Sequence, residues 1–188
     1  MHGLVNRAVE EFARATYGEA VWTATARAVG VDPCGFEIMD STEAEITGRL
    51  IAALAGQLDR SPPELAEDLG AWMAQLAPMR RLLRFAGSDF AAFMMSLEEI
   101  RERGQMVVHR LRLPVLSVMP TASGWEIRSS CDPLWLHAVA GMLHAMADDY
   151  GVLAVIEVAG GRVLVDVPVV DFNAGRPFSI SDPTVGAA

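Results

Sequence analysis

Hydrophobic residues recur at spacings of three and four through the first hundred positions, which is the period of one buried helix face. The first such run predicts a helix over residues 4–16 that ends near Gly18. The second predicts a helix over residues 19–30, and Gly30 closes it because glycine readily adopts the left-handed conformation of a helix end.

Two further helix starts are indicated by capping sequences. Thr42 is followed three residues later by Glu45, and this spacing predicts a capping box ahead of the apolar run "ITGRLIAALAGQL". Ser61 and Glu64 repeat the spacing, with proline between them in the first turn. Both patterns are typical of helix N-termini.

The helical pattern continues beyond residue 75 with interruptions. Pro78 must break or kink it, and Gly87 ends the next segment. Ser88 or Asp89 then caps an amphipathic helix that includes residues 93–104, "FMMSLEEIRERG". The first hundred residues are therefore predicted to be almost wholly helical.

The pattern changes after residue 104. Residues 113–118 and 124–130 are short runs of β-forming residues around a polar turn and predict two strands. A helix follows from the N-cap Asp132, and residues 152–169 predict a hairpin that turns at Gly160 and Gly161.

These elements predict an α+β fold with two parts. An N-terminal helical subdomain, about residues 1–104, packs on a C-terminal subdomain, about residues 105–172, which has a roughly four-stranded antiparallel sheet and an inserted helix. The two parts form a single domain over residues 1–172. Residues 173–188 are rich in Gly, Pro and Ser and are expected to form a flexible tail.

Charge and composition exclude several classes of protein. The net charge of −9 and a pI near 4.8 argue against a nucleic-acid-binding surface, and the one basic cluster, Arg80, Arg81 and Arg84, is interpreted as a solvated helix face. No run of about 18 apolar residues lacks a charge, so no membrane span is expected. The N-terminus is unlike a signal peptide, which predicts a cytoplasmic protein.

Candidate chemistry is sparse. None of the common nucleophile, phosphate-loop, dinucleotide or paired-cysteine motifs occurs, so an enzyme is not expected. His137 and His144 are seven residues apart on one predicted helix, about 10 Å along its axis, and are too far apart to hold one metal unaided. His144 and Asp148 have the spacing of a hydrogen-bonded pair, as do Glu98 and Arg101.

Arg101 is the unusual residue of the amphipathic helix. It lies beside the apolar stripe and not opposite it, since the positions at helical spacing from Phe93 are Leu97, Ile100, Arg101 and Gly104. A charge at this edge requires a partner or access to water.

Several strings, in this order and spacing, give the chain a family resemblance. "MHGLVNRAVEEFARATYGEAVW" resembles the opening of heme nitric oxide/oxygen binding (H-NOX) domains, including the heme-binding subunit of soluble guanylate cyclase. "LRFAGSDFAAFMMSLEEIRE" resembles their proximal-helix segment, "RLPVL" contains the proline that follows it, and "GMLHAMADDYG" resembles the helix between their strands. The resemblance extends from Met1 to about Val170.

The resemblance implies that relatives enclose heme between the two subdomains. Their heme ligand is a histidine eight residues after the phenylalanine of the proximal helix, and Arg101 occupies that position here. Arginine stays protonated and has no lone pair, so it cannot replace a neutral imidazole on iron.

The resemblance also implies a Tyr-x-Ser-x-Arg motif that holds the heme propionates. Ile127, Ser129 and Cys131 occupy its three positions, so only the serine is retained, and Arg128 is a candidate source of the lost positive charge. Cys131 is interpreted as a buried, inert thiol in preference to a redox sensor.

Three further residues match positions that line the heme pocket of relatives. Pro114 corresponds to the proline that presses on the heme face, while Leu4 and Val5 correspond to the N-terminal helix on the distal side. The shape of a pocket is therefore expected to persist without its chemistry.

Two interpretations of Arg101 remain open. In the first, it points into the former heme cavity and attracts an anionic ligand or an acid of the protein itself. In the second, the cavity has closed over apolar side chains and Arg101 extends to water beside Glu98. We favour the second, because an unpaired buried guanidinium is very costly.

The expected function is a stand-alone, bacterial-type H-NOX-like signalling module with no cofactor. The resemblance implies a partner such as a diguanylate cyclase, a phosphodiesterase or a histidine kinase. One alternative is a heme-based gas or redox sensor that uses His109, His137, His144 or Cys131 as the ligand. Another is a binding protein for a different apolar or anionic small molecule in the former heme pocket.

Overall fold

The computed structural model describes residues 3–36, 44–107, 113–130 and 132–169. Its helical part contains α1 (Gly3–Tyr17), α2 (Glu19–Val29), α3 (Ala44–Gln57), α4 (Pro62–Gln75), α5 (Ala77–Arg84), α6 (Phe90–Ser96), the 3₁₀ segment η1 (Leu97–Glu99) and α7 (Ile100–Val107). Its second part contains β1 (Leu116–Pro120), β2 (Gly124–Ser129), α8 (Pro133–Tyr150), β3 (Leu153–Ala159) and β4 (Arg162–Val169). The predicted α+β class, with its antiparallel sheet and inserted helix, is confirmed.

Local sequence explains where most helices begin and end. The Ser61 side chain accepts a hydrogen bond from the Glu64 N–H while the Glu64 carboxylate accepts one from the Ser61 N–H, which completes the predicted capping box of α4. Gly30 ends α2 in the left-handed conformation with φ of 75°. The predicted cap at Thr42 lies outside the described residues, as does the proposed tail over residues 173–188.

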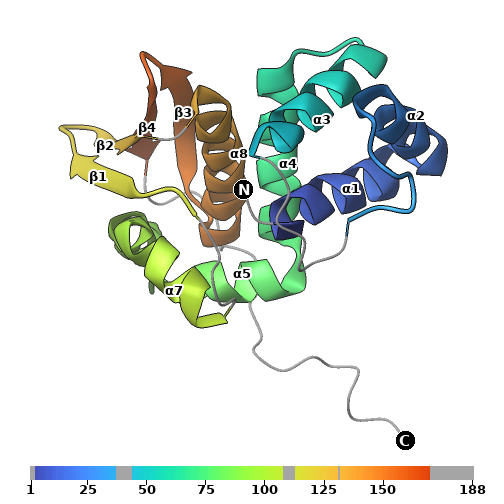
Figure 1. Ribbon diagram of the computed structural model, residues 1–188. Coiled ribbons are helices and arrows are strands. Elements are labelled where there is room, and N and C mark those ends of the chain that lie inside the picture. The colour runs from blue at the N-terminus through green and yellow to red at the C-terminus, as the bar shows by residue number, and fades with distance from the viewer. Residues whose placement is uncertain (1–2, 37–43, 108–112, 131, 170–188) are drawn as a thin grey trace, which may run out of the picture.

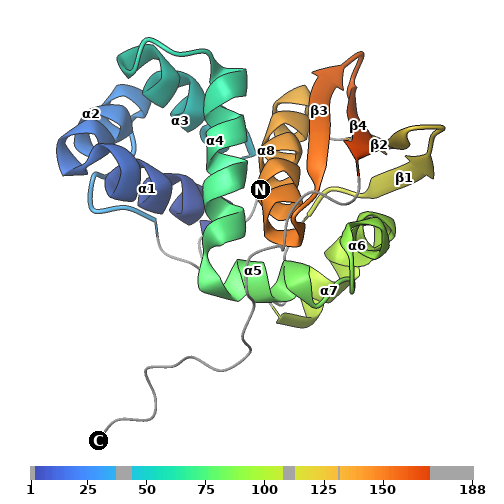
Figure 2. The same cartoon turned by 180° about the vertical axis from the view of Figure 1, so that it is seen from behind.

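The sheet has the strand order β1-β2-β4-β3, and every neighbouring pair is antiparallel. The β3–β4 turn is formed at Gly160 and Gly161, whose φ angles of 59° and 73° lie in the left-handed region that favours glycine. Helix α8 packs on one face of this sheet and contacts α4 on its other side (Figures 1 and 2). Among the described elements, α8 therefore lies between the sheet and the helical part.

The described residues form two apolar clusters. In the first, Trp22, Phe12 and Leu54 are among the buried residues of α1 to α4. The second includes Phe93, Ile127 and Val163 and joins α5, α6 and η1 to α8 and the sheet. The predicted division near residue 104 stays a prediction, because the second cluster includes residues from both sides of it.

The joint between the parts is a close crossing of α4 and α8. A Cβ added to Gly70 would lie 1.8 Å from the carbonyl oxygen of Ala138, and one added to Gly141 would lie 1.8 Å from that of Glu67. Both distances are impossible for real atoms. The two helices therefore approach this closely only because each has glycine at the point of contact.

Two local predictions need correction. The helical break expected at Pro78 occurs at Leu76, whose extended backbone separates α4 from α5, and the proline sits in the first turn of α5, where it needs no N–H partner. The single helix expected around residues 93–104 is divided into α6, η1 and α7. The 3₁₀ turn tightens the chain locally.

No helix within the described ranges is long and apolar enough to cross a membrane.

Candidate functional site

The segment α6–η1–α7 contains the position at which a heme ligand was expected. Asp89 caps it, since its Oδ1 accepts a 2.8 Å hydrogen bond from the Ala92 N–H. Phe93 and Leu97 are buried in the core and Ile100 packs against it. The apolar side of the segment is thus packed into the protein as the helical spacing predicts.

Arg101 is exposed to solvent. Its predicted neighbour Glu98 is used elsewhere, because the Glu98 Oε1 accepts a 2.9 Å hydrogen bond from the Val118 N–H of the edge strand β1. The ion pair within α7 and η1 joins Arg103 to Glu99 at 2.6 Å. The exposure of Arg101 agrees with the second interpretation, in which its side chain extends to water. The Glu98 carboxylate expected beside it is bound to the backbone of β1.

The two described positions of the predicted propionate motif, Ile127 and Ser129, are two residues apart on β2 and therefore lie on the same face of the sheet. Ile127 is 0% exposed and lies in the apolar cluster. Ser129 uses its hydroxyl to donate a 2.8 Å hydrogen bond to the Val115 carbonyl oxygen, which ties β2 to the residue before β1. Cys131 lies outside the described residues.

Arg128 does not replace the lost positive charge. Successive strand residues point to opposite faces, so Arg128 lies on the face away from buried Ile127, where it is exposed and pairs with Glu126. Glu126 also binds Arg162 of β4 at 3.1 Å. The two arginines hold the pKa of the Glu126 carboxyl below its usual range, Arg128 through the larger effect.

The residues expected to line the former heme pocket line neither of the two pockets described for this structure. Pro114 and Val5 are half-buried, and the side chain of Leu4 lies outside the described ones. A pocket of about 10 Å³, which is lined in part by Leu83, Phe93 and Ile100, lies between α5 and the α6–α7 segment. Ligand pockets usually enclose about 300–1,000 Å³, so this space holds no more than a water molecule.

The comparisons with known proteins identify the family. The sequence model of the haem-NO-binding family matches residues 2–158.

The chain belongs to the haem-NO-binding (H-NOX) family. A Cs H-NOX mutant with the unnatural amino acid 4-cyano-L-phenylalanine is similar in structure, with a TM-score of 0.74, 16% identity, and coverage of 92% of this chain and 100% of that one. An H-NOX mutant from T. Tengcongensis gives 0.73 at 16% identity, with the same coverage. No match is found among curated proteins.

Other similar structures include an H-NOX protein from S. oneidensis in the Fe(II) ligation state. Its TM-score is 0.74 at 15% identity, over 89% of this chain and 96% of that one. At these identities the likeness shows the H-NOX fold alone. The predicted resemblance is confirmed by the family match.

The described residues at the H-NOX heme-anchoring positions do not fit heme. The exposed Arg101 has no lone pair for iron, and the aliphatic Ile127 cannot hydrogen-bond a propionate. Arg128, which has the right charge, lies on the opposite face of the sheet. These three side chains therefore do not supply the anchoring chemistry that the resemblance implies for the family.

The alternative heme ligands are also dispersed. His109 and Cys131 lie outside the described residues, and His137 is half-buried on α8. The His144 Nε2 lies 3.4 Å from the Glu67 Oε1 of α4. Within the described ranges no three His, Cys, Asp or Glu residues are grouped as metal ligands are.

The sequence predicted that the basic cluster of α5 is a solvated helix face, but two of its arginines bind groups of α8. Arg80 donates to both carboxylate oxygens of Asp149, at 2.6 Å from Nε and 3.0 Å from Nη2. The Arg84 guanidinium stacks 4.1 Å from the ring centroid of Tyr150. Sequence spacing could not reveal these partners, because they lie more than sixty residues away on α8.

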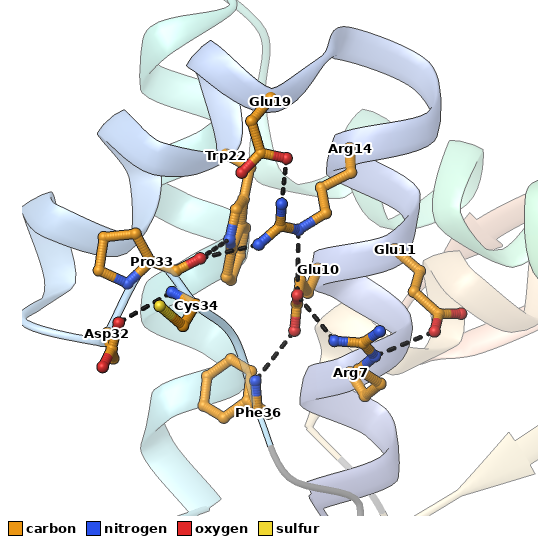
Figure 3. Close-up of polar contacts among 10 residues, drawn as sticks. All are labelled: Arg7, Glu10, Glu11, Arg14, Glu19, Trp22, Asp32, Pro33, Cys34 and Phe36. Atoms are coloured by element: carbon orange, nitrogen blue, oxygen red, sulfur yellow. Dashed lines mark hydrogen bonds and ion pairs between the residues drawn. The ribbon is translucent and has the colours of Figure 1, made fainter.

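Sequence reasoning also missed a buried carboxylate in the helical part. Glu10 is 1% exposed and accepts hydrogen bonds from Arg7 at 2.8 Å, Arg14 at 3.0 Å and the Phe36 N–H at 3.0 Å (Figure 3). A Cβ at Gly35 would lie 2.2 Å from this carboxylate. The sequence signal that could have indicated this site is the spacing of Arg7 and Arg14, three residues before and four residues after Glu10.

The same network fixes the loop that carries Cys34. Arg14 and the Trp22 indole each donate to the Pro33 carbonyl oxygen, at 2.8 and 2.9 Å (Figure 3). Cys34 is exposed, and its hydrogen bond with the Asp32 carboxylate raises the pKa of its thiol. A raised thiol pKa disfavours the reactive thiolate of Cys34.

Proposed function

We propose that the chain is a cytoplasmic, non-enzymatic signalling module of the H-NOX family that does not bind heme through the family's proximal position. It acts through a partner protein. The observation that carries this proposal is the exposed Arg101, which stands where the resemblance implies the proximal histidine. A cation at that position offers iron no electron pair.

Packing around the same segment supports the proposal. Phe93 and Leu97 are fully buried within one apolar cluster that also contains Ile127. The 10 Å³ pocket beside the segment is far smaller than a macrocycle requires. Protein side chains therefore take up the space on this side of the segment.

The partner follows from the family resemblance alone. The resemblance implies that the partner is a diguanylate cyclase, a phosphodiesterase or a histidine kinase. The activity of each purified candidate should be measured with and without the full chain. A change in the activity of one of them, at stoichiometric concentrations, is the expected result, and no change in any of them argues against this part of the proposal.

Visible absorption tests the heme part of the proposal directly. The full chain is expressed with ample heme precursor and purified, and its Soret band is compared with the protein concentration. We expect no stoichiometric band. A stoichiometric band would contradict the proposal.

The substitute-ligand alternative is decided by the same spectrum. If heme is bound, replacing His109, His137, His144 and Cys131 one at a time identifies the ligand, because its loss removes or shifts the band. A native mass above 20.3 kDa without a Soret band would instead favour another small molecule in the family pocket.

A further inference from the structure

A second pocket lies where the end of α4, the helix α5 and the end of α8 meet. Its volume is about 180 Å³, and it is lined by Ala74, Gln75, Arg80, Ala145 and Asp149. Figure 1 shows α5 running beneath the lower ends of α4 and α8. The pocket is thus at the junction of the helical and α/β parts and is separate from the residues expected to anchor heme.

The polar wall of this pocket is a fixed arginine fork. Asp149 is almost fully buried, with 6% of its side chain exposed, and both its oxygens are bound by Arg80. Only two of the five guanidinium N–H groups are used in this pair. Within the described residues, the other three have no recorded acceptor, and the Arg80 side chain is 30% exposed.

The polar groups that line the pocket are the donors of Arg80, the Gln75 amide and the Asp149 carboxylate, which Arg80 already binds. Arg84 places its Nη1 3.5 Å from the carbonyl oxygen of Asp149, so this acid has a guanidinium on its side chain and another at its backbone. The exposed Gln75 side chain at the rim carries an amide that can donate two more hydrogen bonds. Ala74 and Ala145 supply small apolar walls that leave the space open.

We propose that this pocket binds a small oxyanion of the carboxylate or phosphate class on the outward N–H groups of Arg80, with the Gln75 amide at its edge. Guanidinium groups present paired donors that match the planar spacing of oxyanion acceptors. The volume is close to the roughly 150 Å³ of a cavity that holds one benzene molecule, so the ligand has only a few heavy atoms. This inference does not depend on whether heme is bound.

The test uses sodium acetate and inorganic phosphate as probes at constant ionic strength. Nitrogen-15 spectra of the full chain follow the Arg80 Nε–H and the Gln75 side-chain amide during each titration. Saturable shifts with at least one anion, at about millimolar Kd, are expected, and the anion that saturates identifies the class. Non-saturating shifts with both anions would overturn the proposal.

Two variants locate the site. Gln75→Trp fills the pocket from an exposed position and should weaken binding by at least about tenfold without unfolding the chain. Arg80→Lys keeps the charge but removes the fork, and a similar loss is expected if the variant folds. Arg60→Lys changes an exposed arginine on another surface and should leave binding unchanged. Undiminished binding in folded Gln75→Trp would show that the anion binds elsewhere.

Discussion

The crossing of α4 and α8 and the segment α6–η1–α7 are held in place by different means. At the crossing, Gly70 and Gly141 allow backbone to pack directly on backbone, with no room for a Cβ. The segment is instead fixed by the apolar side chains of its inner face and by one hydrogen bond from the Val118 N–H to Glu98. The first region tolerates no added atom, whereas the second depends on interactions that side chains supply.

Both regions belong to a chain of the H-NOX family, in which the resemblance implies heme beside the proximal-helix segment. The glycine crossing joins α4 to α8, while the segment contacts the sheet through η1 and β1. A different residue at position 101 leaves the glycine contact in place, because that contact involves no residue of α7.

The largest expected effect is at the crossing. Gly70→Ala or Gly141→Ala forces the helices apart, and we expect each to lower the free energy of unfolding by at least about 3 kcal/mol. Gly48→Ala is the matched control, because Gly48 is an exposed position of α3 with open space around it, and it should raise stability by up to about 1 kcal/mol. Urea unfolding measures all three. Equal effects at Gly70 and Gly48 would refute the close crossing.

Ile127 tests whether the propionate-motif position is core. Ile127→Tyr, which places the family's tyrosine at this position, should cost about 2 kcal/mol of unfolding free energy, because the added atoms and hydroxyl enter an apolar cluster. Arg128→Tyr, on the other face of the same strand, should change it by no more than about 0.5 kcal/mol. If Ile127→Tyr left the free energy of unfolding unchanged, the space around position 127 would be open enough to hold the larger side chain.

Glu98 tests how the segment is attached to the sheet. Glu98→Ala removes the acceptor of the Val118 N–H, which should cost about 1 kcal/mol and speed hydrogen exchange of that amide about fivefold. Glu98→Gln keeps an acceptor and should have a smaller effect, while Glu102→Ala on the exposed side of α7 should leave the Val118 amide unchanged. Unaltered Val118 exchange in Glu98→Ala would show that the bond does not anchor the segment.

The smallest effect concerns the cap of α6. A hydrogen bond from the Ala92 N–H has the largest effect on the pKa of Asp89 and lowers it in the folded chain. A hydrogen bond from the Ser88 hydroxyl lowers it further. The stabilisation is therefore complete above the unfolded pKa near 4 and is lost as the pH falls through the folded value. Asp89→Asn still caps the helix but lacks the charge. Between pH 7 and pH 3, the free energy of unfolding measured with urea should therefore fall less in this variant than in the wild type. An identical loss of unfolding free energy in the two proteins would show that the Asp89 charge does not contribute to the loss of stability in acid.

Patterns of local origin were predictable from the sequence. The Ser61 capping box, the Gly30 helix end and the Gly160–Gly161 turn each depend on residues a few positions apart, and the structure has all three. The 3₁₀ turn η1 was missed because periodicity cannot distinguish a tightened turn within a helix. The buried positions of the segment nevertheless keep helical spacing, and Arg101 is exposed beside them.

Contacts between distant residues were not predictable. The partners of Arg80 and Arg84 lie on α8, and the neighbour of His144 lies on α4. One sequence carries no signal for such pairs, since they follow from how helices pack. For the candidate site, the sequence indicated the altered residues at positions 101 and 127, whereas only the structure showed one exposed and the other buried in the core.

The most direct measurement of the central claim is the heme content of the purified full chain beside that of a T. Tengcongensis H-NOX expressed and purified identically. Heme is quantified by extraction and by the Soret band, and iron by elemental analysis, each per mole of protein. The account predicts a stoichiometric signal in the control and none in this chain, since Arg101 cannot ligate iron. A one-to-one heme content with an axial-ligand spectrum in this chain would contradict it.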